Sequence, residues 1–130
     1  FKTILPLLTL AILAVGCKKI STPNDASKEL FGKWQYVSSS GGINGDGNQS
    51  LSSDFWIEYT EKGVYKTHVG SERTSKTDFT IEMKESIYST ELQTGIVYEN
   101  NDYVTFEIVN DILTIWDQKY DGYSYQYVKK

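Results

Sequence analysis

The sequence has one cysteine and one histidine in 130 residues, and its thirteen Lys and Arg residues form no basic stripe. A single cysteine excludes an intrachain disulfide, so a folded domain must rely on its hydrophobic core. The scattered basic residues and the net charge of −4 argue against nucleic acid as a partner, because neutralising phosphates requires clustered Lys and Arg.

The composition indicates one folded domain rich in strands. The chain is 39 % hydrophobic and 14 % aromatic, which is too apolar for a disordered protein, and aromatic residues favour strands. Its length points to a single domain. No stretch of ten or more residues repeats apolar side chains at a helical period.

The first sixteen residues predict a signal peptide. Lys2 supplies a positive charge, and residues 4–15 are mostly apolar. This stretch is shorter than the ~20 residues that span a bilayer, and it has the length of the hydrophobic region of an export signal. Gly16 and Cys17 follow directly.

Residues 14–17 (AVGC) resemble the bacterial lipobox. The resemblance implies that Cys17 carries a lipid anchor, that residues 1–16 are removed, and that residues 17–28 are the lipidated cysteine and a flexible, polar tether. Several acyl chains together hold a protein stably on a membrane. By the same resemblance to bacterial lipoproteins, Lys18 after the cysteine implies the outer rather than the inner membrane, with the periplasmic or surface face left open. The alternative is an ordinary export signal followed by an incidental cysteine.

Short alternating segments predict strands through the remaining domain, residues 29–130. Residues 77–84 (TDFTIEMK) show the pattern clearly, with Phe79, Ile81 and Met83 on one face and polar side chains on the other. The predicted strands cover residues 33–38, 54–60, 64–69, 77–84, 86–92, 95–99, 103–109, 112–117 and 123–128.

The regular spacing of these strands predicts an all-β domain, with residues 39–53 and 70–76 as longer loops. We expect an antiparallel up-and-down β-barrel of about eight strands, because a closed barrel leaves no strand edge exposed. A β-sandwich is the alternative. A short helical turn is expected before the first strand, capped by Ser27 and stopped by Gly32.

Residues 30–34 (LFGKW) lead into the first predicted strand. They resemble the Gly-x-Trp signature that opens lipocalin and lipocalin-like barrels. The resemblance implies that Trp34 plugs the closed end of the barrel and that Gly32 permits the tight turn before it. Three later segments also resemble the small lipocalin-like domains of Bacteroidetes lipoproteins: residues 57–65, 110–115 and 125–129.

Aromatic side chains on the first and last predicted strands are the candidate ligand-binding residues. Tyr123, Tyr125 and Tyr127 share one face of the last strand, and Trp34 and Tyr36 share one face of the first. These strands are neighbours in a closed barrel, so the five rings are expected to form a wall that stacks on a lipid, glycan or other small molecule. The alternative is that they fill the core of a small barrel.

No group of residues predicts catalysis, a cofactor or a metal site. His68 lies on a predicted strand, and no Gly-x-Ser-x-Gly sequence marks a nucleophile. Cys17 is used by the lipid, which leaves no thiol for catalysis or zinc. Residues 44–50 (NGDGNQS) resemble the start of a calcium loop, but Gln49 and Phe55 stand where Gly and Glu are needed. We therefore expect a plain loop there.

Two pairs of nearby carboxylates, Glu58 with Glu61 and Glu82 with Glu85, are expected to be solvated rather than to act as an acid–base pair. We therefore expect a protein that is not an enzyme. The first functional hypothesis is a lipid-anchored barrel that binds a small hydrophobic or aromatic-stacking ligand. The second is an envelope structural or protein-interaction module with a filled barrel and no ligand. The ligand, the protein partners and the oligomeric state are left open.

Overall fold

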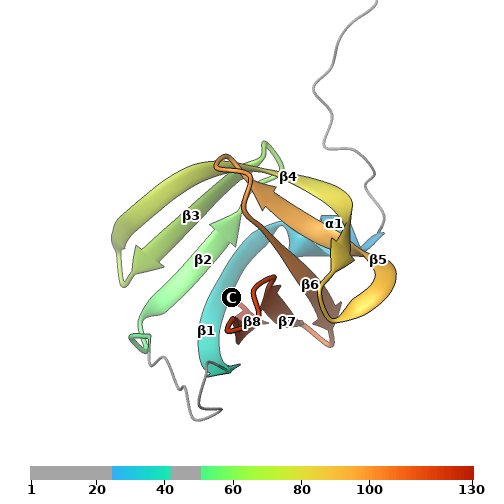
Figure 1. Ribbon diagram of the computed structural model, residues 1–130. Helices are drawn as coiled ribbons and strands as arrows, with labels where there is room; N and C mark the ends of the chain where they lie inside the picture. The colour runs from blue at the N-terminus through green and yellow to red at the C-terminus, as the bar shows by residue number, and fades with distance from the viewer. Residues whose placement is uncertain (1–24, 42–50) are drawn as a thin grey trace, which may run out of the picture.

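A computed structural model describes residues 25–41 and 51–130, and these residues form one helix and eight strands. Each strand is antiparallel to its neighbours, and the strands follow chain order around a closed barrel in which β8 pairs with β1 (Figure 1). The expected up-and-down barrel is confirmed, and the β-sandwich alternative is wrong. The elements are α1 (Asp25–Leu30), β1 (Gly32–Gly41), β2 (Phe55–Tyr59), β3 (Val64–Val69), β4 (Glu72–Ser86), β5 (Ser89–Tyr98), β6 (Tyr103–Val109), β7 (Ile112–Asp117) and β8 (Tyr123–Lys129).

Several expectations fall on residues outside this description. They are the signal peptide, the lipidated Cys17, most of the tether, and the loop at residues 44–50. Within the residues that are described, no helix is long and apolar enough to cross a membrane.

Three expected strand boundaries are wrong: β1 runs to Gly41, into the loop predicted at residues 39–53, and the other two lie around the β4–β5 hairpin. Residues 70–76 were expected as a loop, yet β4 already begins at Glu72. The polar side chains of residues 72–76 are exposed. These residues belong to a strand because their backbone groups pair with β3, and the hydroxyls of Thr74 and Ser75 add hydrogen bonds to Thr67. Two strands are predicted at residues 86–92 and 95–99, but a single strand, β5, runs from Ser89 to Tyr98, while Ser86 ends β4 and residues 87–88 form the turn between them.

The helix α1 begins at Asp25, inside the expected tether, so Ser27 is a buried residue of the helix rather than its cap. Gly32 ends the entry turn with a φ of 130°. A Cβ at this position would lie 2.7 Å from Nζ of Lys129. Glycine is therefore needed here for its backbone conformation, and any side chain would also displace the end of Lys129.

The inward-facing side chains form one hydrophobic core inside the barrel. Phe79 and Ile81 are buried in it as expected, whereas Met83 is 48 % exposed because it lies on the outer half of the β4–β5 hairpin. The buried apolar residues are Leu30, Trp34, Ile57, Tyr59, Phe79, Ile81, Ile96, Phe106, Leu113, Ile115 and Tyr127.

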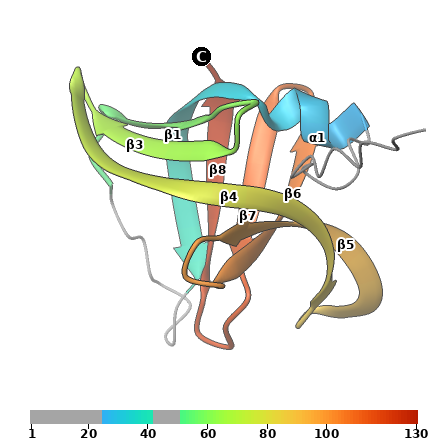
Figure 2. The same ribbon diagram turned by 90° about the horizontal axis from the view of Figure 1, so that it is seen from above.

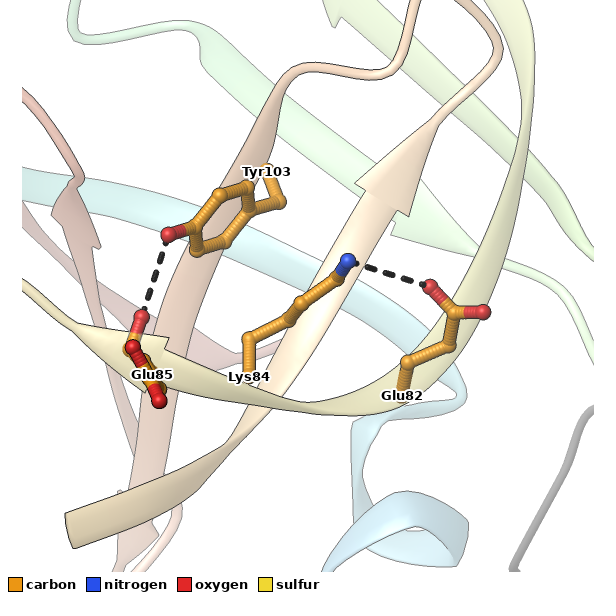
Figure 3. A network of polar contacts seen from close by, with 4 residues as sticks. All are labelled: Glu82, Lys84, Glu85 and Tyr103. Atoms are coloured by element: carbon orange, nitrogen blue, oxygen red, sulfur yellow. Dashed lines mark hydrogen bonds and ion pairs between the residues drawn. The ribbon is translucent and has the colours of Figure 1, made fainter.

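The β4–β5 hairpin extends beyond the barrel wall. β5 pairs with β4 along its length but with β6 only through residues 95–97, and Figure 2 shows the hairpin curving away from the other strands. Tyr103 of β6 holds it in place, because its hydroxyl donates to the Glu85 carbonyl at 3.1 Å and its ring centroid lies 5.4 Å from Nζ of Lys84. Lys84 in turn lies 3.9 Å from the Glu82 carboxylate (Figure 3).

Candidate functional site

One end of the barrel is closed by Trp34 and α1. The indole is 1 % exposed, and its Nε1 donates to the Leu30 carbonyl at 2.8 Å. Nζ of Lys129 lies 4.4 Å from the indole centroid and donates to the Phe31 carbonyl at 2.8 Å. Figure 2 shows α1 and the C-terminus together at this end. Trp34 is therefore packed as a plug, and it lines neither of the cavities described below.

The described residues leave the opposite end of the barrel open, and a cavity of about 850 Å³ enters the barrel there. Pockets that hold small molecules in proteins typically measure ~300–1,000 Å³. The rim is formed by the β5–β6 turn and the start of the β7–β8 loop, at residues 99–102 and 118–119. Six tyrosines line the cavity: Tyr59, Tyr65, Tyr98, Tyr103, Tyr125 and Tyr127.

The tyrosines at the floor of the cavity contact one another. The rings of Tyr59 and Tyr65 stack with centroids 4.8 Å apart, and those of Tyr65 and Tyr98 are 5.2 Å apart. The hydroxyls of Tyr59 and Tyr98 share a hydrogen bond of 2.9 Å. These contacts fix the ring orientations, so the inner wall is preorganised rather than shaped by a ligand.

Burial keeps five of the tyrosine hydroxyls in this cavity protonated. It raises the pKa of Tyr98 and of Tyr125 to about 12, and it also raises the pKa of Tyr59, Tyr65 and Tyr127. The negative charge of Asp117 contributes further to raising the pKa of Tyr98, Tyr125 and Tyr127. At neutral pH these groups are uncharged and can donate or accept hydrogen bonds.

The five candidate ligand-binding residues predicted from the sequence do not lie in one place. Tyr125 and Tyr127 line the open-end cavity, and Tyr123 lines a second cavity. Tyr36 pairs with Tyr127 across β1 and β8, and it packs edge-on against the rings of Tyr127 and Phe55. Trp34 is the plug. The first and last strands thus come together as expected, but the rings do not form one continuous wall.

Sequence reasoning missed Tyr59, Tyr65 and Tyr98, which come from β2, β3 and β5. A signal for the first two was present, since Tyr59 and Tyr65 flank the predicted hairpin turn symmetrically and must point to the same face. Tyr98 gave no comparable signal, because its pairing with Phe79 of β4 depends on the register of a long hairpin.

The second cavity, of about 720 Å³, lies between the β4–β5 hairpin and strands β6–β8. Met83 and Leu92 line it from the hairpin, and Phe106, Trp116 and Tyr123 line it from the barrel. Its wall combines polar and apolar side chains, with fewer aromatic rings than the open-end cavity. Its shape depends on the β4–β5 hairpin, which pairs with β6 only through residues 95–97.

His68 lies on the outer face of the barrel, away from the open-end cavity. Its ring stacks on Trp56 with centroids 3.8 Å apart. Nζ of Lys33 and of Lys130 lie 5.3 Å and 4.3 Å from the same indole, and Arg73 pairs with His68 across β3 and β4. Partial burial lowers the pKa of His68. The Glu58 carboxylate opposes this shift, and the positive charges of Lys66, Lys33 and Arg73 add to it. Strand alternation brings these cations together although they are dispersed in the sequence.

The carboxylates considered above do not form an acid–base pair in the hairpin. Glu82 and Glu85 pair with Gly95 and Leu92 and so point to opposite faces of β4. In residues 25–41 and 51–130, no three His, Cys, Asp or Glu side chains gather in a way that could hold a metal ion.

No protein-family model matches this chain, and no curated protein is significantly similar to it. Its function is therefore argued from the cavity itself.

Proposed function

We propose that this chain is a lipid-anchored envelope protein whose barrel binds a small hydrophobic or aromatic ligand in the open-end cavity. The observation that carries the proposal is the cavity of about 850 Å³ with its tyrosine lining. A barrel filled by its own side chains, the alternative, would have the close packing of a protein interior at this end as well.

The lining supports a flat ligand with few polar groups. Aromatic rings bind other rings by offset or edge-on stacking, which adds to the free energy gained by burying apolar area. A hydroxyl both donates and accepts, so the protonated hydroxyl of Tyr98, which shares one hydrogen bond with Tyr59, can make a second one with an isolated polar atom on such a ligand. The floor of the pocket is rigid, because the rings of Tyr59 and Tyr65 stack on each other and Trp34 is fully packed at the closed end.

A substitution that fills the cavity tests the proposal. Thr77 lines the cavity on β4, half-buried and paired with Tyr65, so Thr77→Trp places a large ring inside it. Thr80 lies on the same strand but is exposed, and Thr80→Trp is the matched control. With indole as the probe, Thr77→Trp is expected to weaken binding about tenfold or more, since the space a ring would occupy is lost, and Thr80→Trp is expected to bind as the wild type does.

The readout is a titration followed by amide chemical shifts, which also reports where indole binds. Shifts concentrated on β3, β8 and the two rim segments would support the proposal. The absence of saturable binding by the wild type, or equal binding by the two tryptophan variants, would contradict it. Native mass spectrometry of the purified mature domain adds a second observation, because a co-purifying small molecule is expected.

The anchor is tested separately. Cys17→Ser removes the thiol that would carry the acyl chains, so the full-length variant is expected to move from the detergent phase to the aqueous phase in a phase-partition assay. If the variant still partitions with detergent and membranes, Cys17 is not the anchor. We propose the outer membrane as the location, on the grounds of Lys18, and we propose no catalytic role for His68.

A further inference from the structure

The charged groups around the open-end cavity are mostly negative. Its lining contains the three carboxylates of Glu99, Asp102 and Asp117, and one ammonium group, that of Lys119. Glu99, Asp102 and Lys119 are exposed on the rim, whereas Asp117 is half-buried. The electrostatic potential inside the cavity is therefore set mainly by Asp117, because water screens the rim charges.

Asp117 faces the inside of the barrel at the end of β7. It pairs with Val104 and follows Ile115 and Leu113 on the inward face of the strand. Its Oδ2 accepts the backbone N–H of Tyr123 at 3.1 Å, and Oδ1 accepts no hydrogen bond from the residues that the structure describes. Its charge reaches the tyrosines lining the cavity, since it contributes to raising the pKa of Tyr98, Tyr125 and Tyr127.

Among the described residues, no Lys, Arg or His forms an ion pair with Asp117. A carboxylate withdrawn from water gains stability from a cation beside it. In residues 25–41 and 51–130, one backbone N–H donates to Oδ2 and none donates to Oδ1, so Oδ1 is available to a positively charged group entering the cavity.

Tyrosine rings supply the second requirement for holding a cation. The face of an aromatic ring carries partial negative charge and attracts ammonium groups within ~6 Å of its centroid, more strongly where water is excluded. Tyr65, Tyr98 and Tyr125 line the same cavity as Asp117, and their contacts with neighbouring rings hold their orientation. A ring cluster with one carboxylate fits an organic cation better than a neutral or anionic molecule.

We propose that the open-end cavity is selective for organic cations, in which a protonated amine or quaternary ammonium group is attached to an apolar or aromatic body, with Asp117 as the counter-ion. This inference rests on the proposed ligand-binding function and specifies the chemical class of the ligand. The apolar body lies against the tyrosine rings, and the ammonium group lies between those rings and Oδ1 of Asp117.

Three indole derivatives with the same ring and different side-chain charge test the inference on the full chain. At pH 7 tryptamine is a cation, tryptophol is neutral and indole-3-acetate is an anion. We expect the wild type to bind tryptamine about tenfold more tightly than tryptophol, with indole-3-acetate weaker still. The amide of Tyr123, which donates to Asp117, is expected to shift with tryptamine and not with tryptophol.

The matched variants are Asp117→Asn and Asp121→Asn. Asn at position 117 keeps an oxygen for the Tyr123 amide and loses only the charge. Asp121 lies in the same loop region, exposed and outside the cavity lining, so Asp121→Asn removes an equal charge elsewhere. Asp117→Asn is expected to abolish the preference for tryptamine over tryptophol, while Asp121→Asn preserves it.

The outcomes separate this inference from the function on which it rests. Equal binding of tryptamine and tryptophol by the wild type overturns the inference and leaves ligand binding intact. An equal loss of both probes in Asp117→Asn, or the same effect in both variants, overturns the role of Asp117. If none of the three probes nor indole binds, both proposals fail. If Asp117→Asn does not fold, the wild type alone tests the inference. Its order of affinity for the three probes and the chemical-shift change of the Tyr123 amide then decide whether the cavity prefers a cation.

Discussion

The two ends of the barrel use the same kinds of side chain for opposite purposes. At the closed end, the Lys129 ammonium lies over the Trp34 ring, and the indole N–H donates to the Leu30 carbonyl. At the open end, Tyr98 and Tyr125 line a cavity, and the Tyr98 hydroxyl shares a hydrogen bond with the Tyr59 hydroxyl. One set of rings fills space and the other encloses it.

The difference indicates a division between stability and binding. Close packing around Trp34 removes apolar area from water and holds α1 against the barrel, which stabilises the fold. Because stability is secured there, the open end can leave ring faces uncovered and a carboxylate without a counter-ion. Substitutions at the closed end should therefore mainly change the free energy of unfolding, and substitutions at the open end should mainly change binding.

Trp34→Ala, at the closed end, should lower the free energy of unfolding by more than any of the other substitutions. Removing a buried Trp leaves a large void and costs about 3–5 kcal/mol of unfolding free energy, and here it also frees the Leu30 carbonyl. Tyr125→Ala, at a half-buried position of the mouth, is expected to cost less than half as much. Urea denaturation followed by circular dichroism measures both, and equal losses would contradict the division.

High pH should lower the free energy of unfolding through the buried tyrosines of the open end. The folded-state pKa of Tyr98 is about 12, above its ordinary value of 10.0, so the stability linked to this hydroxyl is fully present below pH 10 and is lost as the pH rises towards 12. For Tyr98 alone the loss amounts to about 2–3 kcal/mol.

Urea denaturation of wild type and Tyr98→Phe at pH 8 to 12 checks this expectation. The stability of the Phe variant should fall less steeply with pH. Absorbance at 295 nm should show that the native protein ionises fewer tyrosines at pH 11 than the urea-unfolded chain. Parallel pH profiles for the two proteins would be evidence against the buried state of this hydroxyl.

Gly32→Ala tests the entry turn to the closed end. The substitution places a methyl group 2.7 Å from Nζ of Lys129 and imposes a side chain at a φ of 130°, with an expected cost of about 2 kcal/mol. Gly70→Ala is the control, because Gly70 has a φ of 59° and nothing within 4 Å of the new Cβ, so about 1 kcal/mol is expected. Thermal unfolding compares the two, and the reverse order would exclude the steric explanation.

Lys129→Met should have the smallest effect of the closed-end changes. Lys129 and Lys130 each lie over an indole, at 4.4 Å and 4.3 Å, but only Lys129 also donates to the carbonyls at the end of α1. Losing those hydrogen bonds is expected to cost about 1 kcal/mol, whereas Lys130→Met should stay within about 0.5 kcal/mol of the wild type. If both substitutions lower the free energy of unfolding equally, the stabilising effect of Lys129 comes from its cation–π contact and not from its hydrogen bonds.

Much of the fold follows from local patterns, and much of the cavity does not. The bounds of β3, β6 and β7 match the segments predicted at residues 64–69, 103–109 and 112–117, because alternation and tight turns are local properties. The polar half of β4 was missed since its side chains are exposed and its strand character comes from pairing with β3. Asp117 stood at the end of a predicted strand, yet nothing in its neighbours marked it as a cavity residue.

The sequence by itself determined which side chains share a face, because the pleat of a strand alternates them whatever its neighbours are. It therefore placed Tyr123, Tyr125 and Tyr127 together, and it placed Gly32 and Trp34 at the entry to the barrel. Only the tertiary structure decided which end of that face is filled and which is hollow. That outcome depends on the register and tilt of eight strands closing on one another, a non-local property in which Tyr59, Tyr98 and Asp117 meet from distant parts of the chain.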